Sequence, residues 1–186
     1  EIMAFAIPDA ALANVSLWRT RERNLKRLSP LSYAYHPERD VFDAILALKG
    51  FMTDQRLFAV QIDFKKYFDT IPTRYMEQCI DDRELVAVTP HERYILREFM
   101  RHQFAKEQDY HKGRFSRRHI GTPQGSSVSL LLANLANHEL DRALERNSGR
   151  FVRYADDVVA LCSSYSEAEQ IEETFIDHCE NSGLII

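Results

Sequence analysis

Hydrophobic and polar positions alternate along residues 56–63, RLFAVQID. Phe58, Val60 and Ile62 fall on one side of an extended chain, and the residues between them fall on the other. Such alternation is typical of a β-strand with one buried face. The last position is Asp63, so the pattern predicts a strand that ends in a carboxylate.

A helical pattern occupies residues 89–104, TPHERYILREFMRHQF. Thr89 is suited to the N-cap, Pro90 to the first helical position, and Glu92 to the partner position of a capping box. These local signals predict a helix that begins directly after Thr89.

Two further helices are predicted in the second half of the chain. Residues 129–146, SLLLANLANHELDRALER, are very apolar at their start and are followed by NSG, which favours a helix end. A last helix is expected from Ser166, with Glu169 as its capping-box partner, to Gly183. Its buried stripe would consist of Ile171, Phe175 and Cys179.

Two short apolar runs, FVRY and VVALC, lie within residues 151–162 and are separated by Ala155, Asp156 and Asp157. They predict a β-hairpin with two carboxylates at its tip. A solvated turn is the plainer interpretation, although the turn lacks the Gly of the common Asn-Gly and Asp-Gly turns. Two ionised groups between buried strands cost free energy unless they are paired or coordinate a cation.

The order of the elements defines the expected fold class. Helices are followed by a strand, more helices, a loop with Gly and Pro at 121–125, a long helix, a hairpin and an amphipathic helix. This order indicates an α+β fold in which a small antiparallel sheet packs against helices. The final residues, GLII, are expected to open another strand, which suggests a fragment of something longer or its ordered part.

Composition favours a globular protein, because the 186 residues are 45% hydrophobic and 11% aromatic. No segment approaches the roughly 18 consecutive apolar residues of a membrane span, and the start, EIMAFAIPDA, lacks the features of a signal peptide. We therefore expect a soluble cytoplasmic protein with no membrane partner. The cysteines are odd in number and form no CxxC, so they indicate neither disulfides nor a zinc site; they are Cys79, Cys162 and Cys179.

The formal net charge of −4 hides an uneven distribution. Lys and Arg gather at 19–27 and 101–118 and are absent after Arg153, so that residues 154–186 carry only acidic charges. Basic blocks of this kind can mark a surface that binds phosphates. Solvated helix faces are the plainer explanation if charge is considered by itself.

Asp63 changes the interpretation of the hairpin, because it adds a carboxylate at the end of a separate strand. Hard divalent ions prefer oxygen ligands, and a pair of such ions can bridge the attacking and leaving groups of a phosphoryl transfer. Asp63, Asp156 and Asp157 together therefore point to a two-metal site.

Three stretches, VQIDFKKYFDTI, GTPQGSSVSLLLANLANHELD and RYADDVV, occur in this order. They resemble the palm motifs of reverse transcriptases, especially the prokaryotic group II intron, retron and abortive-infection or defence-associated enzymes. The segment at 28–45 is similar to the one that these enzymes carry before the first catalytic strand, so the resemblance covers nearly the whole chain. It implies the fingers and palm of a right-hand polymerase, with the thumb absent from this chain.

The resemblance also implies how the chain is divided. Partial fingers would occupy 1–55, the palm with its first catalytic strand 56–82, a helical insertion of fingers and palm 83–120, and the rest of the palm 121–186. One departure is the start EIMAFAIP, which has no Lys or Arg where the family usually grips the triphosphate. The basic group would then lie upstream, or in the block 19–27, or nucleotide handling would be unusual.

A second departure concerns the subgroup. His36 and Glu38 stand where maturases tend to have Arg and Gly, which weakens assignment to the group II intron enzymes.

By this resemblance, Asp63, Asp156 and Asp157 are the catalytic carboxylates and would hold two Mg²⁺ ions, or Mn²⁺ in their place. Phe68 would lie under the sugar of the incoming nucleotide, where its ring leaves no room for a 2′-hydroxyl; a core position is the plainer interpretation. Gln124 would face the nucleotide from the GTPQG loop, which is otherwise a surface turn. Further nucleotide contacts would be Phe64 and Tyr67, and template or primer contacts would be Gly125, Tyr154, Arg114, Arg117 and Arg118.

The function implied is that of an RNA-directed DNA polymerase, a nucleotidyltransferase that adds deoxynucleotides to a primer 3′-hydroxyl. Its partners would be an RNA template, a DNA, RNA or protein primer, and dNTPs. One alternative is template-independent or protein-primed DNA synthesis by a defence-associated enzyme, and another is a non-catalytic nucleic-acid-binding scaffold. Retroelement, retron and antiviral defence roles stay open, as does the oligomeric state, and a fragment without a thumb can be inactive.

Overall fold

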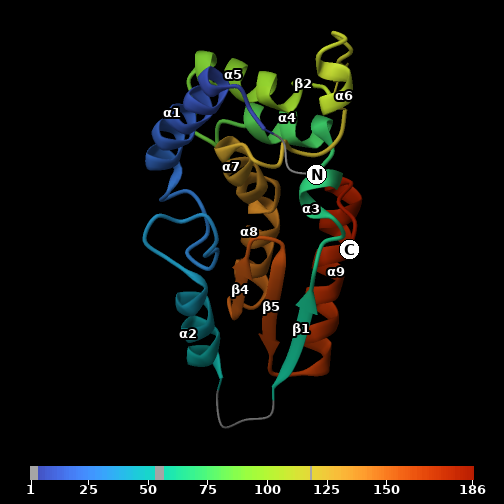
Figure 1. Cartoon of the computed structure of the whole chain (residues 1–186). Coiled ribbons are helices and arrows are strands. Elements are labelled where there is room, and N and C mark those ends of the chain that lie inside the picture. The colour runs from blue at the N-terminus through green and yellow to red at the C-terminus, as the bar shows by residue number, and fades with distance from the viewer. Residues whose placement is uncertain (1–3, 53–56, 118) are drawn as a thin grey trace.

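The computed structural model describes residues 4–52, 57–117 and 119–186 (Figure 1). The helices are α1 Ile7–Asn24, α2 Val41–Phe51, α3 Tyr67–Thr70, α4 Thr73–Asp81, α5 Pro90–Met100, α6 Glu107–Tyr110, α7 Ser127–Ala136, α8 His138–Asn147 and α9 Tyr165–Ser182. The strands are β1 Phe58–Ile62, β2 Gln103–Phe104, β3 Ser116–Arg117, β4 Phe151–Tyr154 and β5 Asp157–Cys162. Figure 1 shows α4, α5 and α6 at one end of the molecule and the sheet with α2 toward the other.

The main sheet has the order β1-β5-β4 and is antiparallel throughout. Val60 of β1 and Phe151 of β4 both face Ala160 of β5, so the three side chains share one face. On the core side, α9 packs against β1 and β5, and α8 packs against β4. The α+β fold with a small antiparallel sheet on helices is therefore confirmed.

The predicted strand at 56–63 is confirmed as β1, and residue 56 lies outside the described residues. The predicted capping box of α5 is also confirmed. The Thr89 hydroxyl accepts a hydrogen bond from the Glu92 backbone N–H at 3.2 Å, and the Glu92 carboxylate accepts one from the Thr89 N–H at 2.8 Å. This helix ends at Met100, earlier than predicted, because the chain then extends into β2.

The N-cap of the last helix lies two residues before the predicted one. It is Ser164, whose hydroxyl accepts a hydrogen bond from the Glu167 N–H at 3.1 Å, so the predicted pair of Ser166 and Glu169 was wrong. The end of the helix is as predicted, with Gly183 in the left-handed conformation at φ 74°.

Residues 183–186 are all described and form no strand, so the expectation that GLII opens one was wrong for this structure. The segment instead lies beside the end of β1, where the Ile185 carbonyl accepts a hydrogen bond from the Lys65 N–H at 2.8 Å.

The long helix predicted over 129–146 is two helices, α7 and α8, joined at Asn137. Asn137 leaves helical geometry with ψ at 7°, and its side-chain oxygen lies 3.2 Å from the His178 Nε2 of α9. The break therefore coincides with a tertiary contact that no local pattern contains.

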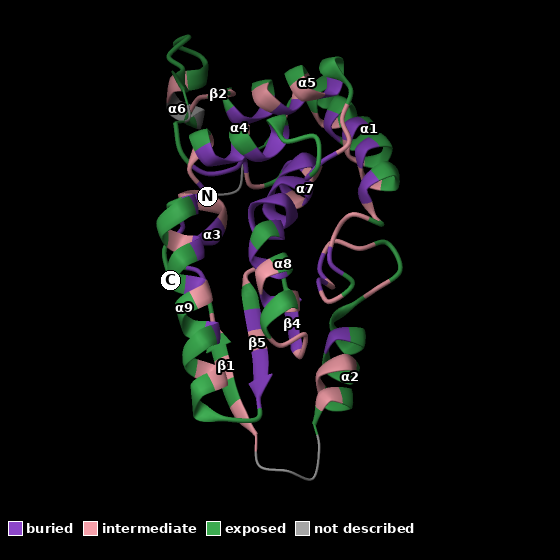
Figure 2. Ribbon diagram, turned by 180° about the vertical axis from the view of Figure 1, so that it is seen from behind, coloured by how far each residue is buried: buried purple, intermediate pink, exposed green. Residues whose placement is uncertain are grey.

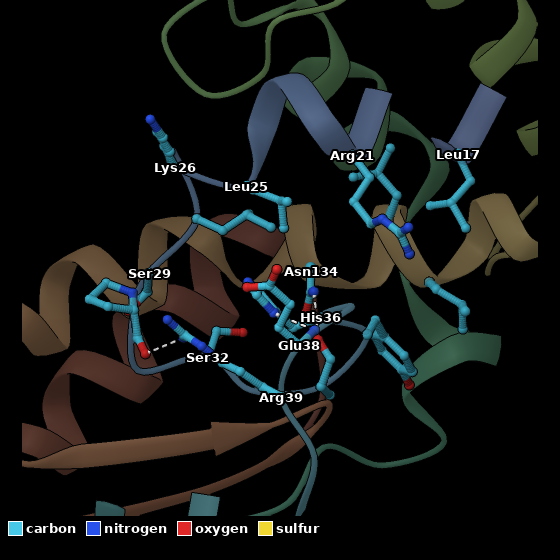
Figure 3. A pocket seen from close by; sticks show the side chains of 16 residues that line it. Leu17, Arg21, Leu25, Lys26, Ser29, Ser32, His36, Glu38, Arg39 and Asn134 are labelled. Carbon is cyan, nitrogen blue, oxygen red and sulfur yellow. Dashed lines mark hydrogen bonds between the residues drawn. The ribbon is translucent and has the colours of Figure 1, made fainter. Parts of the chain in front are cut away.

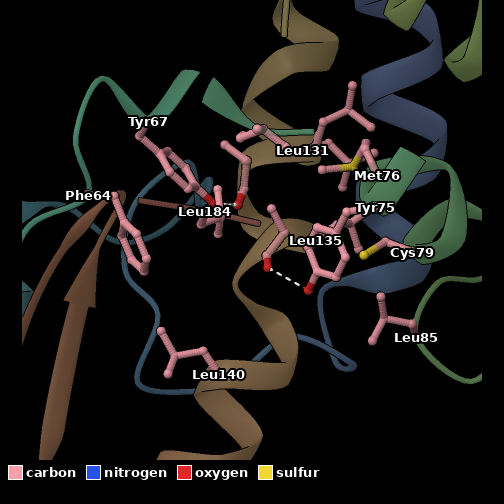
Figure 4. Packing of buried hydrophobic residues seen from close by; sticks show 14 of the residues in the cluster. Phe64, Tyr67, Tyr75, Met76, Cys79, Leu85, Leu131, Leu135, Leu140 and Leu184 are labelled. Atoms are coloured by element: carbon pink, nitrogen blue, oxygen red, sulfur yellow. Dashed lines mark hydrogen bonds between the residues drawn. The ribbon is translucent and has the colours of Figure 1, made fainter. Parts of the chain in front are cut away.

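The core surrounds α7, which is buried along most of its length (Figure 2). The hydroxyl of Tyr67 donates to the Ala133 carbonyl at 2.6 Å, and that of Tyr75 donates to the Ala136 carbonyl at 3.0 Å (Figure 4). Both contacts satisfy buried polar groups, so the rings bury their apolar surface against α7 without leaving a hydroxyl unpaired. Within the described part of the chain, no helix is long and apolar enough to cross a bilayer.

His178 should make the protein less stable in mild acid. Burial is the main cause that lowers the pKa of this imidazole from 6.5 to about 4. The folded chain then binds fewer protons than the unfolded chain between these values, so stability falls as the pH falls through this range. We expect a loss of about 2 kcal/mol in the free energy of unfolding between pH 7.5 and pH 5, measured by urea unfolding.

The matched variant for this prediction is His178→Gln, which keeps a polar amide but does not titrate. Its loss of stability between the two pH values should be smaller than that of the wild type by about the same 2 kcal/mol. Equal losses in both proteins would contradict the assignment to His178.

Candidate active site

The predicted hairpin is present, and its tip is a two-residue turn. Tyr154 pairs with Asp157, so Ala155 and Asp156 form the turn between β4 and β5. Ala155 has φ 60°, and its successor does not have a positive φ, which is the pattern of a type II′ turn. Asp156 is half-buried and Asp157 is exposed, so both carboxylates can be reached from outside.

The sheet register brings Asp63 to the same place. Ile62 is the last residue of β1 and pairs with Val158, so one further step along the register puts Asp63 opposite Asp157. The pKa of Asp156 is raised, mainly by burial and further by the negative charges of Asp63 and Asp157. Asp63 and Asp157 are therefore close enough to Asp156 for their charges to act on it.

These carboxylates offer hard oxygen donors, which is the ligand type that Mg²⁺ and Mn²⁺ prefer. The mutual repulsion at Asp156 also fits a cation, because a divalent ion would compensate the charges that raise its pKa. Among the described residues, no group of three or more His, Cys, Asp or Glu side chains is already arranged to hold a metal ion. The three carboxylates are therefore of the right chemical type to bind such a cation. Their side chains would have to move into a coordinating arrangement when the cation binds.

Phe68 is half-buried and is held between two other aromatic rings. Its ring lies 6.3 Å from that of Tyr35 and 5.7 Å from that of Tyr67, edge to face in both pairs. The pKa of Tyr35 is raised by burial and by the charge of Asp156, so Tyr35 lies near the hairpin tip as well as near Phe68. Tyr35 was not among the predicted site residues. The only signal in the sequence was that Tyr35 lies in the segment 28–45, and the resemblance to the family was noted for that segment as a whole and not for its single residues.

The loop at 121–125 is fastened to the carbonyl end of α3. The Gly121 N–H donates to the Ile71 carbonyl and the Thr122 N–H donates to the Phe68 carbonyl, each at 2.7 Å. Gly121 has φ 78°, and an added Cβ would lie 2.6 Å from the Asp69 carbonyl oxygen, so only Gly fits. The structure thus brings the Gln124 loop beside Phe68.

Two of the predicted nucleotide contacts are core residues. Phe64 and Tyr67 are 1% and 2% exposed, and their rings pack on each other at 5.4 Å. Phe64 also contacts Phe175 and His178 of α9. Because a nucleotide cannot reach these rings, we do not retain Phe64 and Tyr67 as nucleotide contacts.

The predicted template and primer residues lie in different parts of the molecule. Tyr154 is exposed next to the carboxylates, and Gly125 is exposed in the loop, at φ 102°. Arg114 is exposed on the segment between α6 and β3, Arg117 is exposed in β3, and Arg118 lies outside the described residues. The structure therefore groups only Tyr154 and Gly125 with the carboxylates and the 121–125 loop.

A cavity of about 760 Å³ lies between α1, the following loop and α7 (Figure 3). Tyr35 and Asn134 line it, together with the basic side chains of Arg21, Lys26 and Arg39. Arg21 and Lys26 come from the basic block at 19–27, so part of that block faces a cavity that adjoins the candidate site through Tyr35.

A small antiparallel sheet that gathers carboxylates at adjoining strand ends, with helices behind it, is the architecture of a polymerase palm. Comparison with protein-family models identifies the kind: the model described as reverse transcriptase (RNA-dependent DNA polymerase) matches residues 12–186. The chain therefore belongs to the reverse transcriptase family. A search of curated proteins found no match.

Solved structures show the same fold. The chain is similar to telomerase from Candida albicans in complex with a TWJ fragment of telomeric RNA, with a TM-score of 0.63 and 12% identity, covering 96% of this chain and 34% of that one. It is also similar to apo telomerase from Candida tropicalis truncated from its C-terminal domain, with a TM-score of 0.55 and 16% identity, covering 90% and 36%. The chain thus spans about a third of the length of these proteins.

Proposed function

We propose that this protein is an RNA-directed DNA polymerase of the prokaryotic type, which transfers deoxynucleotides to a primer 3′-hydroxyl. The observation that carries the proposal is the convergence of Asp63, Asp156 and Asp157 beside Phe68 and the 121–125 loop, in a chain of the reverse transcriptase family. The prokaryotic assignment rests on the resemblance of the motifs to those of retroelement and antiphage defence enzymes.

In this proposal, Asp63 and Asp156 would hold two Mg²⁺ ions and Asp157 would support them, with Mn²⁺ as a substitute. When bound there, the ions would supply a lower pKa for the primer hydroxyl and would neutralise charge on the α-phosphate. The strands β1 and β5 position the carboxylates for these ions, and Tyr154 would lie beside the primer end.

The nucleotide in this proposal lies between Phe68 and Gln124. Phe68 occupies the space that a 2′-hydroxyl would need. The rings of Tyr35 and Tyr67 keep its ring in place by edge-to-face packing, with ring centroids 6.3 and 5.7 Å from that of Phe68. Gly125 allows the template backbone to approach closely. Arg114 and Arg117 would contact phosphates farther along the nucleic acid.

Primer extension with the purified protein tests the proposal. An RNA template with a DNA or RNA primer, dNTPs and Mg²⁺ should yield a complementary DNA, and Mn²⁺ should also support synthesis. A homopolymer made without template, or DNA attached to the protein, would replace the proposal with template-independent or protein-primed synthesis. RNA binding without any synthesis would indicate a scaffold.

Replacing Phe68 with Val should admit ribonucleotides. The smaller side chain leaves room for the 2′-hydroxyl, so the ratio of kcat/KM for dNTP over rNTP should fall by about 10- to 100-fold. Single-nucleotide incorporation with each substrate measures this ratio. Phe42→Val is the matched control, because Phe42 is 69% exposed on α2 and outside the site. An unchanged ratio in the Phe68 variant would refute the steric role.

A further inference from the structure

Arg153 lies at the centre of a buried polar network directly before the hairpin tip. Its side chain is 0% exposed and pairs with Asp141 of α8, which is also 0% exposed. Nε donates to Asp141 Oδ1 at 2.7 Å, and Nη2 donates to Oδ2 at 2.6 Å. A bidentate pair of this kind fixes the plane of the guanidinium, and burying it costs desolvation free energy that hydrophobic side chains would avoid.

The remaining edge of the guanidinium faces the turn that carries Asp156. Nη1 of Arg153 donates to the Ala155 carbonyl at 2.9 Å. This carbonyl belongs to the peptide group that joins Ala155 to Asp156, and Ala155 adopts φ 60°, a conformation that costs a non-Gly residue about 1–2 kcal/mol. Arg153 therefore holds the strained turn by the peptide from which the Asp156 side chain projects.

Asn134 of α7 extends the network to the other side of the site. Its Oδ1 accepts a hydrogen bond from Nη1 of Arg153 at 3.2 Å, and its Nδ2 donates to the Ala34 carbonyl at 3.0 Å. Ala34 directly precedes Tyr35, which has φ 62° and contacts Phe68. Figure 3 shows Asn134 beside the loop that carries Ser32 and His36.

The backbone of Arg153 is fastened to the same loop. Its N–H donates to the Leu31 carbonyl, and its carbonyl accepts from the Tyr33 N–H, both at 2.9 Å. The loop thus adds a short parallel bridge at Ser32 to the outer edge of β4. Side chain and backbone together connect the hairpin, α7, α8 and the Tyr35 loop through a single residue.

We propose that Arg153 is a positioning residue that, through Asp141 and Asn134, sets the Asp156 turn and the Tyr35 loop in fixed relation to each other. The consequence is that Asp156 is presented for cation binding while Tyr35 holds Phe68 in place. This inference rests on the proposed function, because it assigns the turn to a cation site. It explains why a costly buried ion pair lies next to the carboxylates, where apolar packing would give stability without orientation.

Mn²⁺ binding to the substrate-free protein tests the inference by electron paramagnetic resonance, with thermal unfolding as the check on folding. Arg153→Lys keeps the charge but cannot hold both carboxylate oxygens and the Ala155 carbonyl in one plane. We expect a folded variant with Mn²⁺ affinity weaker by about 10- to 100-fold, the usual cost of removing a group that orients a metal ligand. Single-nucleotide incorporation should show a matching fall in kcat.

Arg150→Lys is the matched control, because Arg150 forms an ion pair with Glu167 at 3.2 Å at the far end of β4. Its Mn²⁺ affinity should equal that of the wild type. If Arg153→Lys does not fold, Asn134→Ala provides the second variant, since it removes only the branch to Ala34 and one contact to Arg153.

Unchanged Mn²⁺ affinity in a folded Arg153 or Asn134 variant would overturn the inference, and so would a wild type that binds no Mn²⁺. Weaker Mn²⁺ binding in the variants of a protein that makes no DNA would support the positioning role and refute only the proposed function.

Discussion

Replacing Asp156 with Asn should abolish nucleotide incorporation and, without metal, make the protein more stable. The loss of activity follows because Asn is a poorer ligand for a hard cation than a carboxylate. The gain in stability follows because burial and the charges of Asp63 and Asp157 raise the pKa of Asp156. The folded chain therefore binds this proton more tightly than the unfolded chain, and stability falls as the pH rises through the raised pKa. Asn carries no charge at any pH, so the stability of the variant does not fall in this way as the pH rises.

Two measurements separate these effects. Single-nucleotide incorporation should fall by about 1,000-fold, because a cation at a reacting phosphate contributes several kcal/mol and each 1.4 kcal/mol is a factor of ten. Thermal unfolding without metal should give a higher Tm for the variant at neutral pH. Mg²⁺ at about 100 times its Kd adds about 2.7 kcal/mol of stability, so the wild type should gain about 5–10 °C in Tm and the variant much less.

The control for the Asp156 variant is Asp177→Asn, because Asp177 is exposed on α9 and outside the site. It removes the same charge and should leave incorporation and the Mg²⁺ effect on Tm unchanged. Wild-type incorporation by Asp156→Asn would refute the two-metal mechanism, and a lower Tm without metal would refute the repulsion among the carboxylates.

Local signals explain which elements could be predicted from the sequence. The capping box at Thr89 and Glu92 lies within four consecutive residues and is present in the structure. The start of α9 was harder, because Ser163, Ser164 and Ser166 can each cap a helix. Glu167 decides among them: its backbone N–H donates to the Ser164 hydroxyl, and its carboxylate accepts from the Ser163 N–H at 2.7 Å.

Tertiary contacts explain what the sequence could not provide at the site. The segment FKKYF offers three aromatic rings, and only the packing of α7 and α9 buries Phe64 and Tyr67 while Phe68 stays half-buried. Arg153 was predicted only as part of a strand, and it does lie in β4. Its polar network could not be predicted, because its partners Asn134 and Asp141 lie 19 and 12 positions away. By contrast, Asp63 and the hairpin were predicted, because Asp63 ends a strand with an alternating pattern and the hairpin tip lies between two short apolar runs.

Replacing Gly121 with Ala should both destabilise the whole protein and disable the proposed nucleotide site. The added Cβ would lie 2.6 Å from the Asp69 carbonyl oxygen and 2.7 Å from that of Phe68. Both atoms belong to the backbone of α3, so no side-chain rotation can relieve the contact. The left-handed conformation at φ 78° adds its own cost. Steric strain of about 1–3 kcal/mol and a backbone cost of about 1–2 kcal/mol give a total of about 3 kcal/mol.

Such a loss corresponds to a fall of about 6–12 °C in Tm, which differential scanning calorimetry would measure. The other glycines separate the two causes. Gly113 has φ 65° and open space around it, so Gly113→Ala should show the backbone cost only. Gly50 has nothing within 4 Å and no positive φ, so Gly50→Ala in α2 should be neutral or stabilising by up to about 1 kcal/mol.

The position of Gly121 also predicts how activity changes. Because the Thr122 N–H donates to the Phe68 carbonyl, any shift that relieves the clash moves the Gln124 loop and Phe68 apart. The variant, assayed well below its Tm, should therefore show a raised KM for dNTPs, while Gly113→Ala and Gly50→Ala keep the wild-type value. A Gly121 variant as stable as that of Gly113 would show that α3 and the loop are not held together by this contact.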